Sequence, residues 1–403
     1  MNGDFNLVLI IRTNGNAFER GFQQGSILKN RIQLALNKVF NSRMFKDVTP
    51  KGVPISLVKI ILGKMGKIKI RKHLETNLPH HAEKLKGISK GANITVSLNY
   101  GLHLLEIIAG DPNTLYKNPP KNNSTGCTML FACPEATKDG ELIYARNYDF
   151  PRVLQPFQMV RIEEPDDGRY KNITLTQYPY VGAHIGLNEK GLVIGYNYGR
   201  CWKKDPLDFR LEGIPGTILV QELIETCSTT QEVIDFITKF PARANGVFYG
   251  VVDKSGDACV IETTATRFAI RRPENGVMAH TNIYLTNELK DANLPEFVRF
   301  KLTSMDFSPI ESPKRRLKRA TELLNKAKGN ITPQTLKSIL RDHDNGDSNS
   351  EGPDDFSICT HGEAAITLAS IIVLPRTGEF WVVDNQPCKA PYEKITFDTP
   401  QNV

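Results

Sequence analysis

A single glycine–cysteine pair limits the possible folds of this chain more than any other part of its sequence. Gly126 and Cys127 follow residues 111–125, a polar segment rich in proline and asparagine, and precede a series of short β-type segments. Polar segments rich in proline and asparagine lie on protein surfaces, where a chain is readily cut. A cut between Gly126 and Cys127 would give the cysteine both a thiol and a free α-amine, and that amine can act as the base for the thiol. The amine titrates near pH 8, which suits a proton acceptor.

The chain on the two sides of this pair differs in pattern. Residues 1–126 are predicted to form a largely helical prosegment, or α-subunit, that begins with a strand at 6–12. Residues 127–403 are predicted to form the core, or β-subunit, because short strands alternate there with tight turns. Helices interrupt the strands at 217–226, 230–239, 314–328 and 332–341. Many antiparallel strands with grouped helices predict an α+β fold of stacked sheets covered by helices.

Composition excludes several classes of protein. The 403 residues are 40% hydrophobic and 24% charged, as in ordinary globular proteins. A net charge of +7 permits an anionic ligand, but no nucleic-acid-binding motif is present. The apolar runs at 7–11 and 364–374 are too short for a secretion signal or a membrane span, so a cytoplasmic location is expected. The seven cysteines lack the spacings of a disulfide framework or a zinc site, which predicts no bound metal.

Several short motifs occur in order along the chain: STGCT at 124–128, ARNYDF at 145–150, GLNEKGLVIGYN at 186–197, AHTN at 279–282, RLKRA at 316–320, and DH at 342–343 with SICTH at 357–361. Together they resemble the peptidase C45 family, which includes the acyl-CoA:6-aminopenicillanic acid (isopenicillin N) acyltransferases. The set is more distantly similar to the choloylglycine hydrolases and penicillin V acylases. The resemblance implies the N-terminal nucleophile (Ntn) hydrolase fold, a four-layer αββα sandwich of two antiparallel sheets flanked by helices.

The resemblance also implies roles for single residues. Cys127 corresponds to the family nucleophile, released by self-cleavage after Gly126. Asp149 resembles the carboxylate that holds the new α-amine, and Arg146 the arginine beside the nucleophile sulfur. The interval between Cys127 and Arg146 is longer than in the family pattern, which a longer first hairpin would absorb.

Three further positions match the family. Asn197 resembles the asparagine that helps to form the oxyanion hole, and Asn282 the second asparagine near the nucleophile. Arg316 is similar to the late arginine of the charge network, and its neighbour Arg315 is the alternative. The two permanently charged arginines, Arg146 and Arg316, are expected to lower the pKa of the thiol.

These roles describe acyl transfer through a thioester on Cys127, in which a positioned oxyanion donor contributes about 3–4 kcal/mol. Attack by water gives hydrolysis, and attack by an amine gives transfer. The substrate is expected to be a small amide or an acyl-CoA thioester, with no cofactor. One alternative is a choloylglycine-hydrolase-like amidase for N-acyl amino acids or conjugated bile salts. Another is a binding protein without turnover. Without processing, a Cys127–His280 or Cys127–His361 pair becomes the rival nucleophile and base.

Two predictions concern partners. The two cleavage fragments are expected to remain together as a heterodimer, and a homo-oligomer is left open. The stretch from Leu57 to Leu74 combines apolar residues with six lysines or arginines and no acid. This pattern predicts a basic amphipathic helix that contacts anionic lipid or a CoA phosphate. The alternative is an ordinary surface helix of the prosegment.

Overall fold

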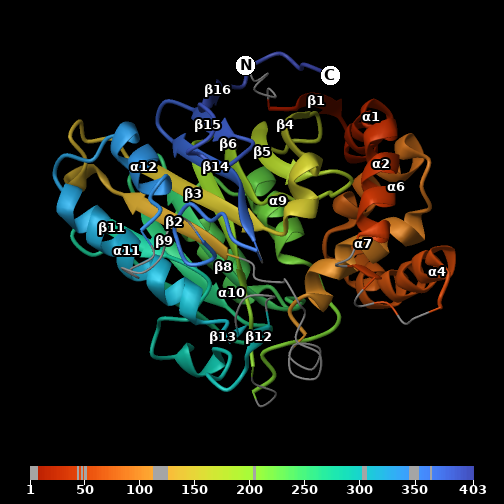
Figure 1. Ribbon diagram of the computed structural model, residues 1–403. Helices are drawn as coiled ribbons and strands as arrows, with labels where there is room; N and C mark the ends of the chain where they lie inside the picture. The colour runs from red at the N-terminus through yellow and green to blue at the C-terminus, as the bar shows by residue number, and fades with distance from the viewer. Residues whose placement is uncertain are drawn as a thin grey trace, which may run out of the picture.

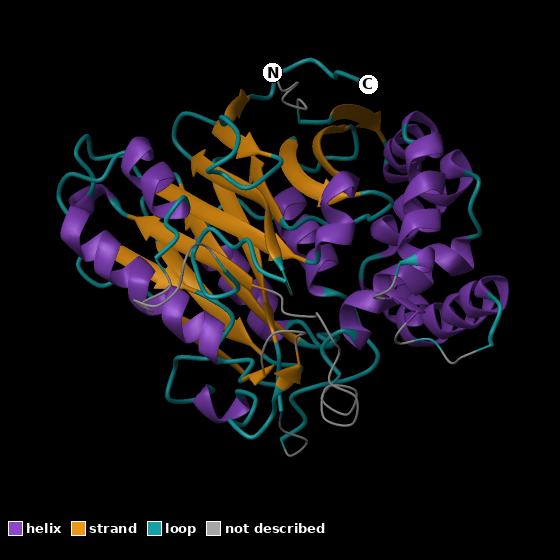
Figure 2. Cartoon of the chain, in the orientation of Figure 1, coloured by secondary structure: helices purple, strands orange, loops and turns teal. Residues whose placement is uncertain are grey.

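Two β-sheets form the centre of the molecule (Figures 1 and 2). The structure is a computed structural model that describes residues 8–42, 45–46, 49, 52–111, 126–202, 206–301, 306–344, 354–363 and 365–403. The polar segment expected at 111–125 lies outside these ranges, apart from Asp111.

The first sheet has eight strands and is antiparallel except at one edge, where β1 and β4 run parallel. Its strands, in spatial order, are β1 (Ile10–Gly15), β4 (Gln158–Pro165), β5 (Asn172–Gln177), β6 (Ile185–Asn188), β7 (Leu192–Gly199), β8 (Gly246–Asp253), β9 (Ala258–Thr263) and β10 (Phe268–Arg271).

The second sheet has six antiparallel strands, in the order β11 (Val277–His280), β2 (Gly126–Ala132), β3 (Ile143–Phe150), β14 (Ile366–Leu374), β15 (Glu379–Val383) and β16 (Glu393–Ile395). A separate pair joins β12 (Phe300–Lys301) to β13 (Asp306–Phe307).

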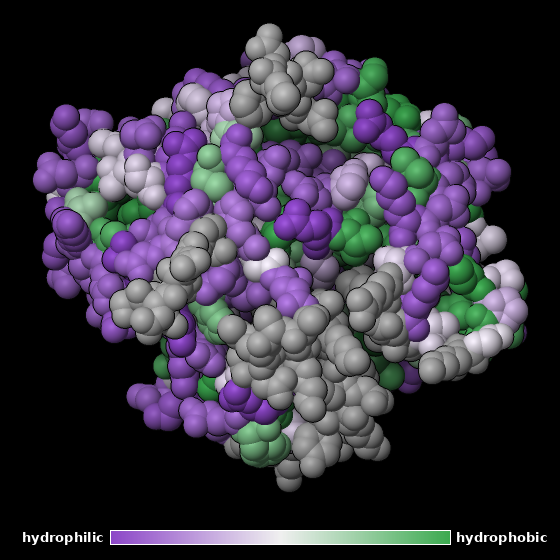
Figure 3. Space-filling model, viewed as in Figure 1, coloured by the Kyte–Doolittle hydropathy of each residue, from purple (hydrophilic) through white to green (hydrophobic). Residues whose placement is uncertain are grey.

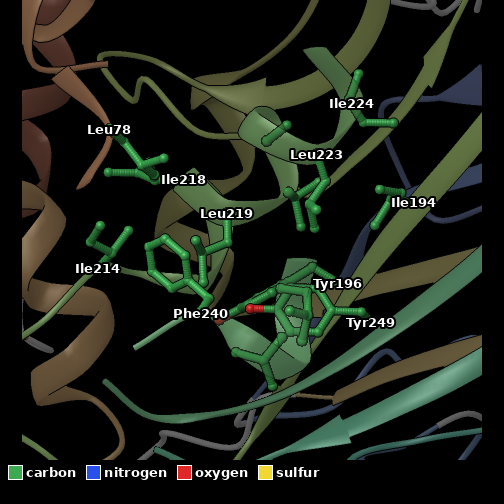
Figure 4. Close-up of a cluster of buried hydrophobic side chains, with 14 of the residues drawn as sticks. Leu78, Ile194, Tyr196, Ile214, Ile218, Leu219, Leu223, Ile224, Phe240 and Tyr249 are labelled. Atoms are coloured by element: carbon green, nitrogen blue, oxygen red, sulfur yellow. The ribbon is translucent and has the colours of Figure 1, made fainter. Parts of the chain in front are cut away.

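Alternation along the strands produces the layers, because successive side chains of a strand point to opposite faces. In β2, Met129 and Phe131 pack between the two sheets, whereas Leu130 and Ala132 face the helices α11 (Glu311–Ala327) and α12 (Pro333–Leu340). On the outer face of the first sheet, α9 (Gly216–Thr226) covers β6 and β7, and its side chains lie near Ile194 and Tyr196 (Figure 4). The helix α10 (Thr230–Lys239) covers β8 and β9. The expected αββα order of layers is therefore confirmed.

A helical lobe lies beside the sandwich (Figure 1). It consists of α1 (Ala17–Ile27), α2 (Lys29–Asn41), α4 (Ile55–Gly66), the π-helical turn η1 (Lys67–Arg71), α5 (Lys72–Asn77), α6 (Pro79–Ala92) and α7 (Val96–Ile108). The prediction of a largely helical N-terminal part agrees with this. The division at residue 126 is a prediction about processing, and the strand β1 from the N-terminal part belongs to the first sheet.

Glycines allow α1 and α6 to touch backbone to backbone. Gly21 and Gly25 of α1 face Gly87 and Gly91 of α6. A Cβ at Gly21 would lie 2.1 Å from a carbonyl oxygen of α6, and one at Gly87 would lie 2.2 Å from a carbonyl oxygen of α1. Since no side chain fits there, this spacing of four residues fixes how the two helices pack.

A cluster of buried charges joins the lobe to the sandwich. Glu163 of β4 accepts a hydrogen bond from Lys84 of α6 at 2.6 Å and lies 3.2 Å from Nε of Arg161. Arg20 of α1 lies 3.6 Å from both Glu163 and Glu225 of α9. All five side chains are fully buried. Breaking one such pair leaves an uncompensated buried charge, which costs about 3–5 kcal/mol.

The last residues of the chain cover the free edge of β1. Asn402 receives a hydrogen bond on its Oδ1 from the backbone of Ile10 at 2.8 Å and donates from Nδ2 to the carbonyl of Val8 at 2.9 Å. Arg12 donates to the carbonyl of Phe397 at 2.7 Å. The strand β1 therefore lies between β4 and the C-terminal segment.

Most predicted elements are present with small shifts of their ends. Helix α10 spans the residues expected at 230–239, and α11 starts three residues earlier than predicted. Residues 6 and 7 of the strand predicted at 6–12 lie outside the described ranges; β1 occupies Ile10–Gly15, because the ladder to β4 continues through Thr13 and Asn14. Within the described ranges, no helix has the length and apolar character needed to cross a bilayer. The cytoplasmic location stays a prediction.

Replacing Gly87 with alanine should destabilise the protein. Alanine is the better helix former by about 1 kcal/mol, yet its methyl group would press on the backbone of α1, and overpacking of this kind costs about 1–3 kcal/mol. We expect the free energy of unfolding in urea to fall. The matched control is Glu83→Ala, an exposed position on the same helix, which should change it by less than about 0.5 kcal/mol. Equal stability of the two variants would contradict the close packing.

Candidate active site

The hairpin of β2 and β3 carries the predicted nucleophile. Its register pairs Cys127 with Tyr148 and Gly126 with Asp149. The link between the strands contains a short 3-10 turn, η2 (Pro134–Ala136), and this link accommodates the long interval between Cys127 and Arg146. Cys127 is buried with 2% of its surface exposed.

The main-chain atoms of Cys127 are held by two predicted site residues. The N–H of Cys127 donates to Oδ1 of Asn282 at 2.8 Å, just beyond β11. The carbonyl of Cys127 accepts from Nη1 of Arg316 at 2.7 Å, and Nη2 of the same guanidinium donates to Oδ1 of Asn282 at 3.1 Å. Asn282 and Arg316 therefore both bind the main chain of Cys127, and they also bind each other.

The side chains of Arg316 and Arg315 lie in different environments. Arg316 points from α11 into the site, is 1% exposed, and also donates to Thr128 Oγ1 at 3.0 Å. The side chain of Arg315 is 37% exposed and pairs with Glu311 on its own helix at 2.8 Å. Only Arg316 of this pair contacts the predicted nucleophile.

Arg146 lies at the sulfur of Cys127. Its Nη2 is 3.1 Å from Sγ, and the same nitrogen donates to the carbonyl of Tyr196. Its Nε donates to Oδ1 of Asn197 at 3.2 Å, which fixes the orientation of that amide. Nδ2 of Asn197 makes only long contacts, of 3.3–3.4 Å, to the carbonyls of Cys127, His280 and Thr281.

Asp149 lies beside Gly126. Its carboxylate accepts hydrogen bonds from Thr367 at 2.7 Å and from Thr360 at 3.4 Å. A Cβ on Gly126 would lie 3.0 Å from Oδ2 of Asp149 and 3.1 Å from Nη2 of Arg316, so this position is tight for any larger residue. The nitrogen of Cys127 meets Asn282, while the carboxylate expected to hold it faces the preceding residue.

Burial dominates the electrostatics of the site. It raises the pKa of the Cys127 thiol, and Arg146 and Arg316 oppose this rise without overcoming it. The two arginines act in the expected direction and lower the pKa of the thiol, but in the intact chain desolvation disfavours the thiolate more strongly. Burial likewise raises the pKa of Asp149, against the field of Arg316.

Sequence reasoning missed several residues at this site. Tyr148, Ile366 and Leu368 pack with Cys127, and Thr367 is the strongest partner of Asp149. Tyr148 also stacks on His184, with ring centroids 4.4 Å apart. The register of β2 with β3 could have indicated Tyr148, but the other contacts come from distant segments and leave no local signal.

The histidines proposed as rival bases have other neighbours. Nδ1 of His280 is 2.9 Å from Arg271, and its ring packs on Phe248. His361 lies beside Cys359, at 3.4 Å. In the parts of the chain that the structure describes, no hydrogen bond joins Sγ of Cys127 to a histidine.

Comparison with known proteins points to one family. A family model described as acyl-coenzyme A:6-aminopenicillanic acid acyl-transferase matches residues 136–383, more than half of the chain. The matched range contains Arg146, Asp149, Asn197, Asn282 and Arg316, and it begins after Cys127. Protein dcd1A of Dictyostelium discoideum is 24% identical over an alignment of 271 residues, and the match covers 61% of this chain. The chain spans little more than half, 56%, of that relative.

Three solved structures are similar to this chain at a low level. The Caenorhabditis elegans ortholog of N-acylethanolamine-hydrolyzing acid amidase has a TM-score of 0.41 and 13% identity, covering 62% of this chain and 93% of its own. A mutant conjugated bile acid hydrolase from Clostridium perfringens has a TM-score of 0.41 and 15% identity, covering 67% and 92%. Penicillin V acylase from Agrobacterium tumefaciens has a TM-score of 0.40 and 14% identity, covering 64% and 82%. At these scores the likeness adds nothing to the family match.

Replacing Arg316 with lysine should cost stability although the charge is kept. A lysine cannot reproduce the fork that serves Cys127, Thr128 and Asn282, and each buried group left without a partner costs about 1–3 kcal/mol. We expect Arg316→Lys to lower the free energy of unfolding by at least about 2 kcal/mol, and Arg315→Lys to change it by less than about 0.5 kcal/mol. Both are measured in a Cys127→Ala background by urea denaturation. A similar loss in the two variants would refute the assignment.

Proposed function

The chain belongs to the acyl-coenzyme A:6-aminopenicillanic acid acyl-transferase family, and we propose that it is a cysteine amidohydrolase or acyltransferase whose nucleophile is Cys127. The observation that carries the proposal is the environment of this one residue. Its nitrogen, carbonyl oxygen and sulfur each meet a different polar partner, Asn282, Arg316 and Arg146. Because the family match starts after Cys127, the choice of nucleophile depends on these contacts.

In the proposed maturation, Cys127 cuts its own peptide bond. Its Sγ attacks the carbonyl carbon of Gly126, the C–N bond breaks, and the nitrogen takes up a proton to become the α-amine. Water then hydrolyses the resulting thioester, leaving a carboxylate on Gly126 and a free thiol on Cys127. The close approach of Gly126 to Asp149 and Arg316 supports this step, since both charged groups lie beside the bond that breaks.

In the mature site, the α-amine would act as the base for the thiol. Asn282 already holds the nitrogen of Cys127 at 2.8 Å, and cleavage leaves that contact available. Once the thiol proton has moved to the α-amine, the thiolate and Asp149 stand opposite Arg146, Arg316 and the new α-ammonium group, which stabilise the thiolate. The thiolate attacks an amide or thioester carbonyl, the amine or thiol leaves with the proton, and water or an acceptor amine releases the acyl group.

Asn197 is the proposed oxyanion donor. Its amide is oriented by Arg146, and its Nδ2 is engaged only in long contacts. A charge that develops on the substrate oxygen would make a stronger, charge-assisted hydrogen bond with such a donor.

We propose that the two fragments remain together after cleavage. Residues 1–126 contribute β1 to the first sheet, and Arg20 and Lys84 to the buried cluster around Glu163. Separation would expose these charges and an unpaired strand edge at once.

The first test is intact mass spectrometry under denaturing conditions on the wild type, Cys127→Ala and Cys133→Ala. Cys133 is a buried thiol next to the end of β2, so its variant is the matched control. We expect the wild type and Cys133→Ala to yield fragments 1–126 and 127–403, and Cys127→Ala to stay whole. Native gel filtration should show the fragments eluting together. A wild-type chain that remains intact would remove the α-amine from the mechanism.

A second measurement separates the competing functions. Incubation with p-nitrophenyl acyl esters should give an acyl adduct on the Cys127 peptide, detected by mass spectrometry, and turnover with added amines separates transfer from hydrolysis. Turnover of N-acyl amino acids would support the choloylglycine-hydrolase-like alternative. Absence of an adduct on processed protein would indicate a binding protein.

We further propose that the helical segment from α4 to α5 contacts anionic membrane. Four large apolar side chains are exposed there among the lysines: Leu57, Ile60, Ile61 and Ile68, the last of them 70% exposed. Figure 3 shows hydrophobic atoms at the end of the molecule where α4 lies. Apolar side chains surrounded by basic ones suit a surface of negatively charged headgroups.

Liposome flotation tests this contact. We expect binding to vesicles with phosphatidylserine, weaker binding at high salt, and none to phosphatidylcholine alone. Ile61→Glu with Ile68→Glu should lower binding by at least about tenfold, since each buried isoleucine contributes about 1.5–3 kcal/mol. Ile270→Glu, an exposed position on β10, is the control. Equal flotation with both lipids would end the proposal.

A further inference from the structure

Four metal-binding side chains converge outside the predicted active site. His343, Cys359, His361 and Cys388 each offer one ligand atom, and these atoms all lie within 4.8 Å of one another. The sulfurs of Cys359 and Cys388 are 3.7 Å apart, and Nε2 of His361 is 3.4 Å from the first and 3.2 Å from the second. Two thiols and two imidazoles are a donor set typical of structural zinc.

The distances suit a tetrahedral ion at the centre. Zn–S bonds of about 2.3 Å place two sulfurs about 3.8 Å apart at the tetrahedral angle, and Zn–N bonds of about 2.0–2.1 Å place sulfur and nitrogen about 3.6 Å apart. The observed separations are equal to these or shorter by a few tenths of an ångström. A disulfide would need the sulfurs at about 2.05 Å, so the pair is reduced in this arrangement.

One donor has no hydrogen-bond partner among the residues that the structure describes. This is Nε2 of His343, which is buried. Its ring lies edge-on to that of His361, with centroids 5.1 Å apart. A buried nitrogen without a partner is costly, and a bound ion would supply the missing interaction.

The surrounding backbone is already in place to hold the donors. Asn147 of β3 donates to the carbonyls of Leu340 and Ile358 at 2.9 Å each, which ties the segments before His343 and Cys359 to the second sheet. The N–H of Cys359 donates to the carbonyl of Asp342 at 2.9 Å, so these two segments are also tied to each other. A site on segments fixed in this way needs little ordering to bind a metal.

We propose that these four side chains bind one Zn²⁺ ion. Binding replaces the two thiol protons, which pass to solvent, and the complex of one dication with two thiolates is neutral. The proposed zinc site does not include Cys127, and the proposal does not depend on the role of that residue. The sequence gives no sign of this cluster, because the four side chains come from three separate segments, and Cys359 and His361 are only two residues apart.

The ion would act on the active site through one residue. Thr360 stands between two of the ligands and donates to Asp149 at 3.4 Å. The N–H of Thr360 donates to Oγ1 of Thr367 at 3.0 Å, and that hydroxyl in turn donates to Asp149 at 2.7 Å. Fixing Cys359 and His361 on a metal would fix Thr360 between them.

The test uses the untagged full-length chain, purified without chelators or immobilised metal. Zinc content is measured by plasma mass spectrometry on the wild type, Cys388→Ala and the control Cys133→Ala. Cys388 is exposed, so its replacement leaves the core intact. We expect about one zinc ion per chain in the wild type and the control, and a clearly lower zinc content in Cys388→Ala, which lacks one of the four ligands.

Cobalt provides an independent readout that does not depend on activity. Co²⁺ added to the metal-free chain should give the strong visible bands of a tetrahedral site and a thiolate charge-transfer band, both absent in Cys388→Ala. Three outcomes overturn the proposal: wild-type protein that takes up neither metal, equal zinc in Cys388→Ala, or an intact mass two hydrogens lower from a Cys359–Cys388 disulfide.

Discussion

A buried carboxylate determines how the two halves of this chain fit together. Glu163 lies where β4 meets the helical lobe, and no part of its side chain reaches solvent. A lone charge in that place would be prohibitively costly, so Lys84, Arg20 and Arg161 must all arrive for the junction to close. Because these cations come from α1, α6 and β4, the cluster disfavours any other position of the lobe against the sandwich. The glycine contacts between α1 and α6 then fix the spacing of two of its members.

The predicted active site depends on the same kind of convergence at a smaller scale. Cys127 belongs to β2, but its partners come from β3, from the segment after β11, and from α11. The site is therefore complete only when the second sheet has paired and its outer helix has docked. Arg316 makes this dependence strict, because one guanidinium serves Cys127, Thr128 and Asn282 together. The site is therefore assembled from four elements, of which only β2 and β3 are neighbours in the sequence.

Local patterns were sufficient for most of the elements and for stacked sheets covered by helices, whereas the αββα order of the layers was implied by the family resemblance. The hairpin at Cys127, helix α10 and the alternation along β2 follow directly from residue spacing. The set of site residues could be proposed because each lies in a short motif, and the structure places them around one cysteine.

Local patterns could not predict contacts between segments that are far apart in the sequence. Nothing in the sequence shows that β1 pairs in parallel with β4, that Asn282 takes the nitrogen of Cys127, or that burial outweighs two arginines in the pKa of the thiol. The four donors around Cys359 were missed for the same reason. Each of these features depends on distances between segments far apart in the chain, and spacing rules describe neighbours only.

The position of β1 has a consequence for folding. Its contact with Asn402 joins residues 392 positions apart, which closes almost the whole chain into one loop. Contacts between such distant segments cost more loop-closure entropy than local ones, so forming this edge is slow relative to closing a local hairpin. In a chain cut after Gly126, the same step becomes an encounter between two molecules, and refolding from denaturant acquires a dependence on concentration that an uncut chain lacks.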